Sequence, residues 1–589
     1  MNTHEALISA YVSLGYSVDD QGCCHGTSLR WLEASFLDEE PKFHKRLLKI
    51  AAYGKYLKTA IEAVKAKRGE NLTKEDKYLL EIQAFMDHLY IFQAPFEQRS
   101  LFNSSLPILQ EDIDKASTLG SSDTIEQLGG LTKVYSHPLI YNEQEIALYL
   151  DDLGQALEKH CPLHGKKIGI LLSSHTHTSA LIYTTGRGEW RYMDINEYPP
   201  ESFSKESTPK LARNIVESFK EHESPYVAFA SRVITVKKDP FINQLTEELS
   251  KLRTKHPVTS NLARRTEQVN LCYLASQQGD AQIVEETARY GANIEFTDKD
   301  GITPVMIAAM DGYDDVIDVL AKHKANLNVV NQPNGWTPIH YAISDRYTKV
   351  LTRLAQNNAD LNVRAKNGFT PLLLAVINGN VEAVVELIKF GANVSVSLPW
   401  PIKDFKPKDA LANKRFNFLV KQKLIVNDTI MLCPQDIAFI DGKDQIVTLF
   451  RHAQRINSLY QTVTAFEKDC ENKQAQQVIA AAHGLVEFTN EYISTLYSAP
   501  HALELDEWNN RYTNGMQFLS AQSQEPHYLD SLNKINAQFK SLITARRPTM
   551  KDSPLKRKSL FSNDTPEAKR IKFTEHSLDG NMDLKTGFS

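Results

Sequence analysis

An internal repeat of 33 to 34 residues is the feature that most constrains this 589-residue chain. The repeat is marked by three Thr-Pro pairs, which begin at Thr303, Thr337 and Thr370. Proline is favoured in the first turn of a helix, and apolar residues follow each pair at helical spacing. A unit of this length cannot bury its apolar face alone, so neighbouring units must stack. The repeat therefore predicts a helical solenoid in the middle of the chain.

Two imperfect copies extend the array. Residues 270–296 lack the Thr-Pro pair but keep the rest of the pattern, which is typical of a capping repeat. A later copy begins at Cys433-Pro, 63 residues after Thr370, which is about 30 more than one period. We therefore expect about five repeats over 265–454, with an insertion near 396–428 that forms loops on one face, often the binding face.

The repeated Thr-Pro-Leu-His-x-Ala-like pattern resembles that of ankyrin repeats. The resemblance implies paired helices and a protein partner held by the repeats and their insertion. Asn362 closes the stretch LAQNNADLN, which resembles the site modified by the ankyrin asparaginyl hydroxylase of host cells. That resemblance makes Asn362 a candidate for hydroxylation, although many ankyrin repeats share the pattern for purely structural reasons.

Residues 1–258 precede the array and contain no repeat. Four segments show helical patterns: 28–37, 42–68, 73–95 and 142–160. From residue 166 onward, short runs rich in β-branched and aromatic residues replace that pattern, and a further strand-like run covers 226–236. Helices followed by a small sheet predict an α+β domain. The whole chain is thus expected to be multidomain and mostly α-helical.

The C-terminal part is expected to differ again. Residues 455–545 show helical patterns, whereas 546–589 are polar and expected to be disordered. This tail holds the basic clusters PLKRK at 554–558 and PEAKRIKF at 566–573. The second cluster resembles a monopartite nuclear localisation signal, which implies binding to a nuclear import receptor. The alternative is a generic solvated tail.

Composition excludes several classes of function. The net charge of −5 argues against direct nucleic-acid binding by the whole molecule. The six cysteines are scattered apart from one adjacent pair, so we expect no disulfide framework, and a zinc site lacks its usual spacing. The N-terminus does not have the pattern of a secretory signal, and no apolar run is long enough to span a membrane. We expect no cofactor.

The adjacent pair lies in QGCCHGTSLRW, residues 21–31. A glycine-rich turn here leads into a helical pattern, and the start of a helix lowers the pKa of a thiol because its N–H groups and dipole favour the anion. Cys24 is therefore a candidate nucleophile, although Cys23 is not excluded. Two ordinary buried cysteines are the alternative.

A cysteine nucleophile needs an imidazole and a group that orients it. We expect a hairpin with its loop at about 184–188, so that paired residue numbers sum to about 372. This register places His177 opposite Asp194 or the next residue, and His175 opposite one of the two after those. Cross-strand neighbours have Cβ atoms about 5 Å apart, so a histidine on one strand can meet a carboxylate on the other.

These residues also resemble papain-like cysteine proteases, and most closely the bacterial effector branch of the YopT and AvrPphB type. Three motifs carry the resemblance: Gly22-x-Cys24-x-Gly26 with Trp31 following, His177-Thr-Ser-Ala opening a strand, and Met193-Asp194-Ile195-Asn196 closing the next. The resemblance implies Cys24 as nucleophile, His177 as general base and acid, and Asp194 as the orienting residue. The backbone N–H of Cys24 would then form part of an oxyanion hole.

One position departs from that branch. Its members carry an amide side chain several residues before the cysteine, which donates to the oxyanion. Here Asp19 lies five residues upstream and Gln21 three, and a carboxylate repels developing negative charge. Whether the triad is active therefore stays open at this stage.

The order of the predicted parts adds a second resemblance. A papain-like domain, central ankyrin repeats and a helical C-terminal region are similar to the ankyrin-repeat effectors of Legionella. This implies a bacterial protein secreted into a host cell, where it would act on a host protein in the nucleus and cytoplasm. The alternative is a non-catalytic adaptor that sequesters a host nuclear protein and so alters host transcription.

Overall fold

The computed structural model describes most of the chain before residue 452. The described residues are 3–16, 22–67, 72–95, 101–102, 112–159, 164–174, 176–220, 224–265, 270–423, 425–451 and 537. They belong to two compact units, Met1–Asn326 and Leu327–Ser589, and each is described by itself. The predicted helical region 455–545, apart from residue 537, and the basic tail 546–589 lie outside the described residues.

The first unit begins with helices. They are α1 (Thr3–Leu14), α2 (Cys24–Phe36), α3 (Glu40–Tyr53), η1 (Gly54–Tyr56), α4 (Leu57–Ala66), α5 (Lys74–Gln93), α6 (Ile113–Gly120) and α7 (Asp123–Gln127). Three of the predicted helical patterns fall on α2 to α5. The start of α5 is fixed by a capping box, in which Thr73 and Asp76 satisfy one another's backbone N–H groups.

A six-stranded antiparallel sheet follows, in the order β1-β6-β2-β3-β4-β5. Its strands are β1 (Leu131–Asn142), β2 (Lys167–Ser173), β3 (Thr178–Thr184), β4 (Glu189–Met193), β5 (Glu201–Phe203) and β6 (Tyr226–Val236). The strand-like runs predicted from the sequence are β2, β3, β4 and β6. The two edge strands were not predicted; β1 contains Pro138 and a register shift between Lys133 and Tyr135, which obscure its pattern.

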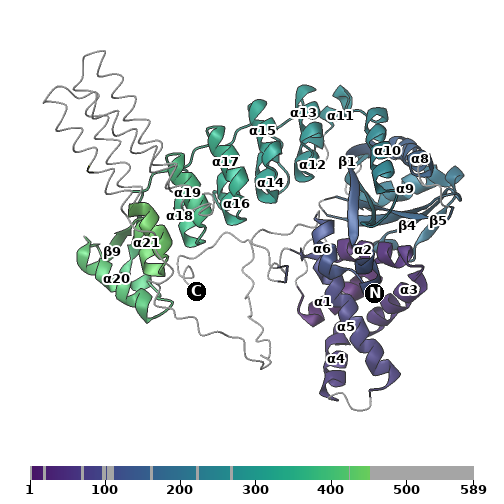
Figure 1. Ribbon diagram of the computed structural model, residues 1–589, viewed down its shortest axis with the longest axis horizontal. Helices are drawn as coiled ribbons and strands as arrows, with labels where there is room; N and C mark the ends of the chain where they lie inside the picture. The colour runs from purple at the N-terminus through teal and green to yellow at the C-terminus, as the bar shows by residue number, and fades with distance from the viewer. Residues whose placement is uncertain are drawn as a thin grey trace. The chain divides into compact units, whose positions relative to one another are not determined.

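Helices cover both faces of this sheet (Figure 1). Besides the N-terminal helices, they are α8 (Glu143–Lys159), α9 (Thr208–Phe219) and α10 (Ile242–Lys255). Alternate residues of β3 serve the two faces: Ile182 joins the core that contains α2 and α5, whereas Tyr183 packs against Gly154 of α8. Because both faces are covered, β3 is buried along its whole length, which explains its apolar sequence.

The first two ankyrin helix pairs belong to this same unit. After α11 (Ser260–Arg264) they are α12 (Leu271–Gln277) with α13 (Ala281–Arg289), and α14 (Pro304–Asp311) with α15 (Asp314–Lys322). The first pair packs against β1 and β6. Arg232 of β6, which is almost fully buried, donates two hydrogen bonds to Gln278 at the end of α12. The first repeat is thus joined to the sheet by a buried polar contact as well as by apolar packing.

The second unit continues the array. Its elements are α16 (Pro338–Ser344) with α17 (Thr348–Gln356), α18 (Pro371–Ile377) with α19 (Val381–Lys389), and α21 (Pro434–Asp441) with a helical segment at 444–451. The Thr-Pro pairs act as expected, since Thr370 caps α18 through the N–H of Leu373. Cys433 takes the same position before α21, where Asp436 accepts from its backbone N–H.

The insertion does not form the loops that we expected. It folds into a three-stranded sheet and a helix: β7 (Leu398–Pro401), η5 (Ile402–Asp404), α20 (Ala410–Gln422), β8 (Ile425–Val426) and β9 (Thr429–Leu432), in the sheet order β7-β9-β8. Trp400 and Phe416 of the insertion are buried, and the ring of Phe416 stacks on Phe405. The segment contains enough apolar residues for a small core of its own, which explains why it is ordered.

Candidate active site

Cys24 is the first residue of α2, and Cys23 is the residue that caps this helix. The start of α2 is held close to α5. The backbone N–H of Gly26 donates to Gln93 Oε1 at 3.0 Å, and a Cβ atom on Gly26 would lie only 2.3 Å from the backbone oxygen of Leu89. Glycine is therefore required at position 26, where the start of α2 lies against the backbone of α5.

His177 and Asp194 are delivered by the ends of two neighbouring strands. His177 directly precedes β3 and Asp194 directly follows β4, and their Nε2 and Oδ2 atoms are 2.9 Å apart. The other carboxylate oxygen of Asp194 accepts from the backbone N–H of Asn196 at 2.8 Å. The backbone N–H of His177 donates to Ser174 Oγ at 3.0 Å. The pair is thus oriented from both sides.

The predicted register of this hairpin was wrong by one residue. Paired numbers in β3 and β4 sum to 373, as in Ala180 with Met193, and the loop covers 185–188. His177 and Asp194 lie just beyond the paired segment, so they are not direct cross-strand partners. They meet because the chain turns into the 3-10 helix η3 (Ile195–Glu197) immediately after Asp194.

A second imidazole, which the sequence did not predict, also reaches the thiol. His4 of α1 places its Nε2 atom 3.6 Å from Cys24 Sγ, within hydrogen-bonding range for sulfur. Its ring packs against the turn before α2, because a Cβ atom on Gly22 would lie 3.1 Å from the same nitrogen. His4 is twenty residues from Cys24 and belongs to no motif, so the sequence offered no signal for this contact.

The surroundings favour the ionised form of the thiol. Burial of Cys24 would raise its pKa, but hydrogen bonds and charge interactions with His177 and His4 outweigh burial and lower it from 9.0 to about 7. Position at a helix start favours the anion as well. Close to neutral pH, Cys24 is therefore partly a thiolate.

The pKa of the His177 imidazole shifts in the opposite direction, upward. Burial would lower the pKa of His177, but its hydrogen bonds to Asp194 and Cys24, and their negative charges, raise the pKa to about 10. For Asp194, burial would raise the pKa, but His177 lowers it below its ordinary value. Between about pH 7 and pH 10 the three groups thus form a thiolate, an imidazolium and a carboxylate.

The site is enclosed. Cys24, His177 and Asp194 are respectively 2%, 7% and 4% exposed, whereas His4 is half-buried. A thiolate beside an imidazolium that a carboxylate orients has the groups needed for nucleophilic attack on a carbonyl and proton transfer to a leaving group. Among the described residues, no group of three or more His, Cys, Asp or Glu side chains is placed to hold a metal ion.

The remaining candidates lie apart from this site or outside the described residues. Cys23 is buried, and its carbonyl oxygen accepts from the N–H and hydroxyl groups of Thr27. His175, Asp19 and Gln21 lie outside the described residues. Cys24 Sγ contacts the imidazole of His4.

Asn362 lies in the second unit and its side chain is exposed. Its amide oxygen accepts from the backbone N–H of Asn393 at 2.8 Å, and its own N–H donates to Asp360 Oδ1. Asn362 therefore links the loops of two successive repeats. That structural role exists with or without hydroxylation, which stays a prediction.

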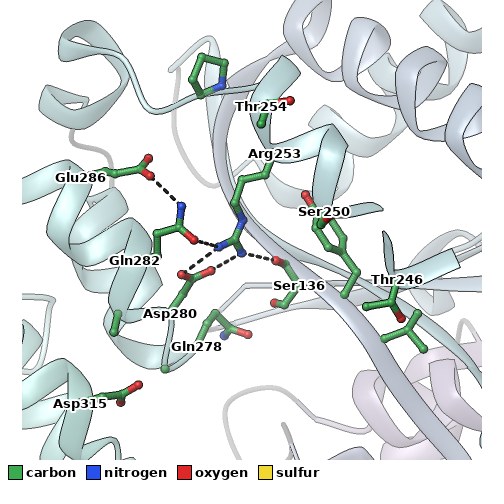
Figure 2. A pocket seen from close by; sticks show the side chains of 15 residues that line it. Ser136, Thr246, Ser250, Arg253, Thr254, Gln278, Asp280, Gln282, Glu286 and Asp315 are labelled. Atoms are coloured by element: carbon green, nitrogen blue, oxygen red, sulfur yellow. Dashed lines mark hydrogen bonds and ion pairs between the residues drawn. The ribbon is translucent and has the colours of Figure 1, made fainter. Parts of the chain in front are cut away.

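A separate hollow of about 840 Å³ lies between α10, β1 and the first ankyrin repeat (Figure 2). Arg253 of α10 lies at its centre. Its guanidinium forms an ion pair with Asp280 at 2.5 Å and donates to the carbonyl oxygen of Ser136 at 3.1 Å and to Gln282 Oε1 at 3.3 Å. These contacts join the repeat to the sheet domain. The charge of Arg253 is already paired with Asp280, so this guanidinium is not free to bind an anionic ligand.

No helix in the described part of the chain is both long and apolar enough to cross a membrane. Comparison with protein-family models gives two matches. One described as ankyrin repeats (3 copies) covers residues 271–365, and one described as an ankyrin repeat covers residues 367–397. The chain therefore contains ankyrin repeats at 271–397, as the sequence predicted, and modules of this kind bind other proteins.

Proposed function

We propose that this protein is a cysteine-dependent hydrolase or acyltransferase that acts on a protein bound by its ankyrin repeats. One observation carries the proposal: Cys24 Sγ interacts with two imidazoles, those of His4 and His177, and Asp194 binds His177 at 2.9 Å. A scaffold without chemistry needs neither an ionised thiol nor an oriented imidazolium. The resemblance to papain-like proteases agrees with the same assignment.

The steps follow from the positions of the three groups. The Cys24 thiolate attacks the carbonyl carbon, and the carbonyl π electrons move to oxygen. The backbone N–H of Cys24, at the start of α2, would donate to that oxyanion. As the intermediate collapses, the bond to the leaving amine breaks and His177 gives the amine its proton, so that a thioester remains. Neutral His177 then removes a proton from water or another nucleophile, which attacks the thioester and frees the thiol.

Recruitment of the target is assigned to the repeats and the folded insertion. The insertion exposes large apolar side chains on α20, β8 and β9: Leu411, Phe418, Val426 and Met431. Seven Lys and Arg residues against three Asp residues accompany them over 398–432, although the whole chain is acidic. Exposed apolar side chains in a segment with an excess of basic residues fit a protein segment that combines acidic and apolar side chains.

The place of action is part of the same proposal. We assign the protein to the class of bacterial effectors that are secreted into a host cell, where it acts in the nucleus and cytoplasm. The resemblance to Legionella ankyrin effectors and the basic clusters at 554–558 and 566–573 support this. A fluorescent fusion that lacks 546–589 should lose nuclear accumulation in host cells, whereas an unchanged distribution would contradict the nuclear part.

The test of catalysis compares three chains in host cells: wild type, Cys24→Ala and Cys272→Ala. Cys272 is a matched control because it is buried in α12, away from any imidazole, and burial raises the pKa of its thiol to about 12. Quantitative mass spectrometry should find new protein N-termini or acylated products with wild type and Cys272→Ala only. Identical products in all three chains would refute the enzyme.

A non-catalytic adaptor is the second candidate, and the near-complete burial of the Cys24 thiol favours it. In that case the ankyrin repeats and insertion sequester a host nuclear protein. The same three chains separate the candidates: an adaptor keeps its whole effect on host transcription when Cys24 is replaced, but loses it with Phe418→Asp on the insertion. The enzyme requires both residues.

A further inference from the structure

We propose that His4 is a catalytic residue of this site and that its Nε2–H group supplies the second hydrogen bond to the oxyanion. The inference rests on the proposed acyl-transfer function, and it concerns a residue outside the Cys24, His177 and Asp194 set. His4 comes from α1, an element that contributes nothing else to the chemistry. Its Nε2 atom is 3.6 Å from the reacting sulfur.

The position of His4 suits an oxyanion donor. When Sγ bonds to a carbonyl carbon, the developing oxyanion is held on the carbon next to the sulfur, and a donor must approach it to about 2.7–3.1 Å. A nitrogen 3.6 Å from Sγ reaches that volume with a small movement of the ring. His4 is also half-buried, so it can contact a substrate as well as the thiol.

His177 is not available for this role. Its Nε2 atom is bonded to Asp194, and its other nitrogen must exchange the proton with the leaving group and water. The two imidazoles therefore divide the work: His177 transfers protons, and His4 stabilises charge. The backbone N–H of Cys24 supplies the first donor to the oxyanion, and His4 adds a second donor aimed at the same developing charge.

The hydrogen bonds of His4 support a donating tautomer. Burial would lower its pKa, but hydrogen bonds to Cys24 and to the side chain of Asn196 raise the pKa above 6.5, against the opposing charge of His177. With Asn196 as partner of one ring nitrogen, the other donates toward the thiol. Asp194 and Asn196 belong to one turn, η3 and the residue before it, so this turn positions both imidazoles.

The test uses two probes that differ in one respect. Iodoacetamide alkylates a thiolate by direct displacement, without an oxyanion, whereas p-nitrophenyl acetate acylates it through a tetrahedral oxyanion. The full-length chain is compared as wild type, His4→Leu and His4→Gln at pH 9, where a Cys24 thiol with a pKa of about 7 is almost wholly thiolate and one at the ordinary 9.0 is still about half thiolate. Mass spectrometry of the Cys24 peptide gives both rates.

For His4→Leu we expect acylation of Cys24 to slow by about 10²–10³-fold and alkylation to change by less than about threefold. His4→Gln restores an N–H donor, so it should recover at least a tenth of the wild-type acylation rate, and it serves also if His4→Leu does not fold. Equal losses in both reactions, or no loss in acylation, would overturn the role of His4. If wild type itself is not acylated at Cys24, the proposed function fails first.

Discussion

The most direct consequence of the site is the pH at which Cys24 becomes reactive. With a thiol pKa of about 7, roughly a quarter of Cys24 is thiolate at pH 6.5, against about 0.3% for a thiol at the ordinary 9.0. This gives about 75-fold more thiolate. A thiolate of lower pKa is also intrinsically less nucleophilic, by about eightfold over two pKa units. The net expectation is alkylation about tenfold faster than an unperturbed cysteine of equal access.

Access to the thiol is restricted in this protein, so the midpoint of the pH profile is a better measure than the absolute rate. We expect the rate of iodoacetamide labelling of Cys24, followed by peptide mass spectrometry from pH 5 to pH 10, to rise with a midpoint near 7. His177→Ala removes the partner that lowers this pKa most, while burial of the thiol still raises it. The midpoint should therefore move upward by at least one pH unit.

Cys272→Ala is the control, because it removes a thiol that does not contact the site. It should leave the Cys24 midpoint unchanged. A wild-type midpoint at 9 or above would show that the imidazoles do not act on Cys24. A midpoint that stays near 7 in His177→Ala would show that His177 is not the residue responsible, and either result would refute the reasoning.

Three further predictions test how the site and its support are built. Asp194→Asn removes the negative charge beside His177, so acylation of the thiol by p-nitrophenyl acetate should slow by about 10²-fold or more. Gly26→Ala places a methyl group against the backbone of α5 and should lower the free energy of unfolding in urea by about 1–3 kcal/mol. Arg253→Ala leaves Asp280 without its ion-pair partner and should lower the same free energy by about 1–3 kcal/mol. A wild-type acylation rate for Asp194→Asn would contradict the first prediction. A wild-type urea midpoint for Gly26→Ala or Arg253→Ala would contradict the prediction made for that variant.

The parts of the molecule that could be predicted are those specified by local sequence. The ankyrin array was predictable because Thr-Pro pairs and helical spacing repeat at a fixed period, and the family matches at 271–397 confirm it. The proximity of His177 and Asp194 was predictable because one hairpin joins them. Even there the predicted register was wrong by one residue, because the exact loop length depends on how the strands pair in the sheet.

The parts that could not be predicted depend on contacts between distant segments. His4 contacts Cys24 because α1 packs beside the turn at Gly22. No motif or residue spacing in the sequence indicates that packing. The edge strand β1 was missed because Pro138 breaks its pattern, yet edge strands tolerate proline. We expected the insertion to form loops because its sequence has no periodic apolar pattern that would indicate the small core around Trp400.

The joining of the first two repeats to the sheet domain has a consequence for selectivity. Under the proposed function, a protein held by those repeats is tethered to the unit that contains Cys24, and a short flexible tether gives its exposed segments an effective concentration in the millimolar range. The proposed active site then needs little affinity for any particular peptide. Bystander proteins with the same local sequence would escape modification, because discrimination would depend on how long a target stays bound to the repeats.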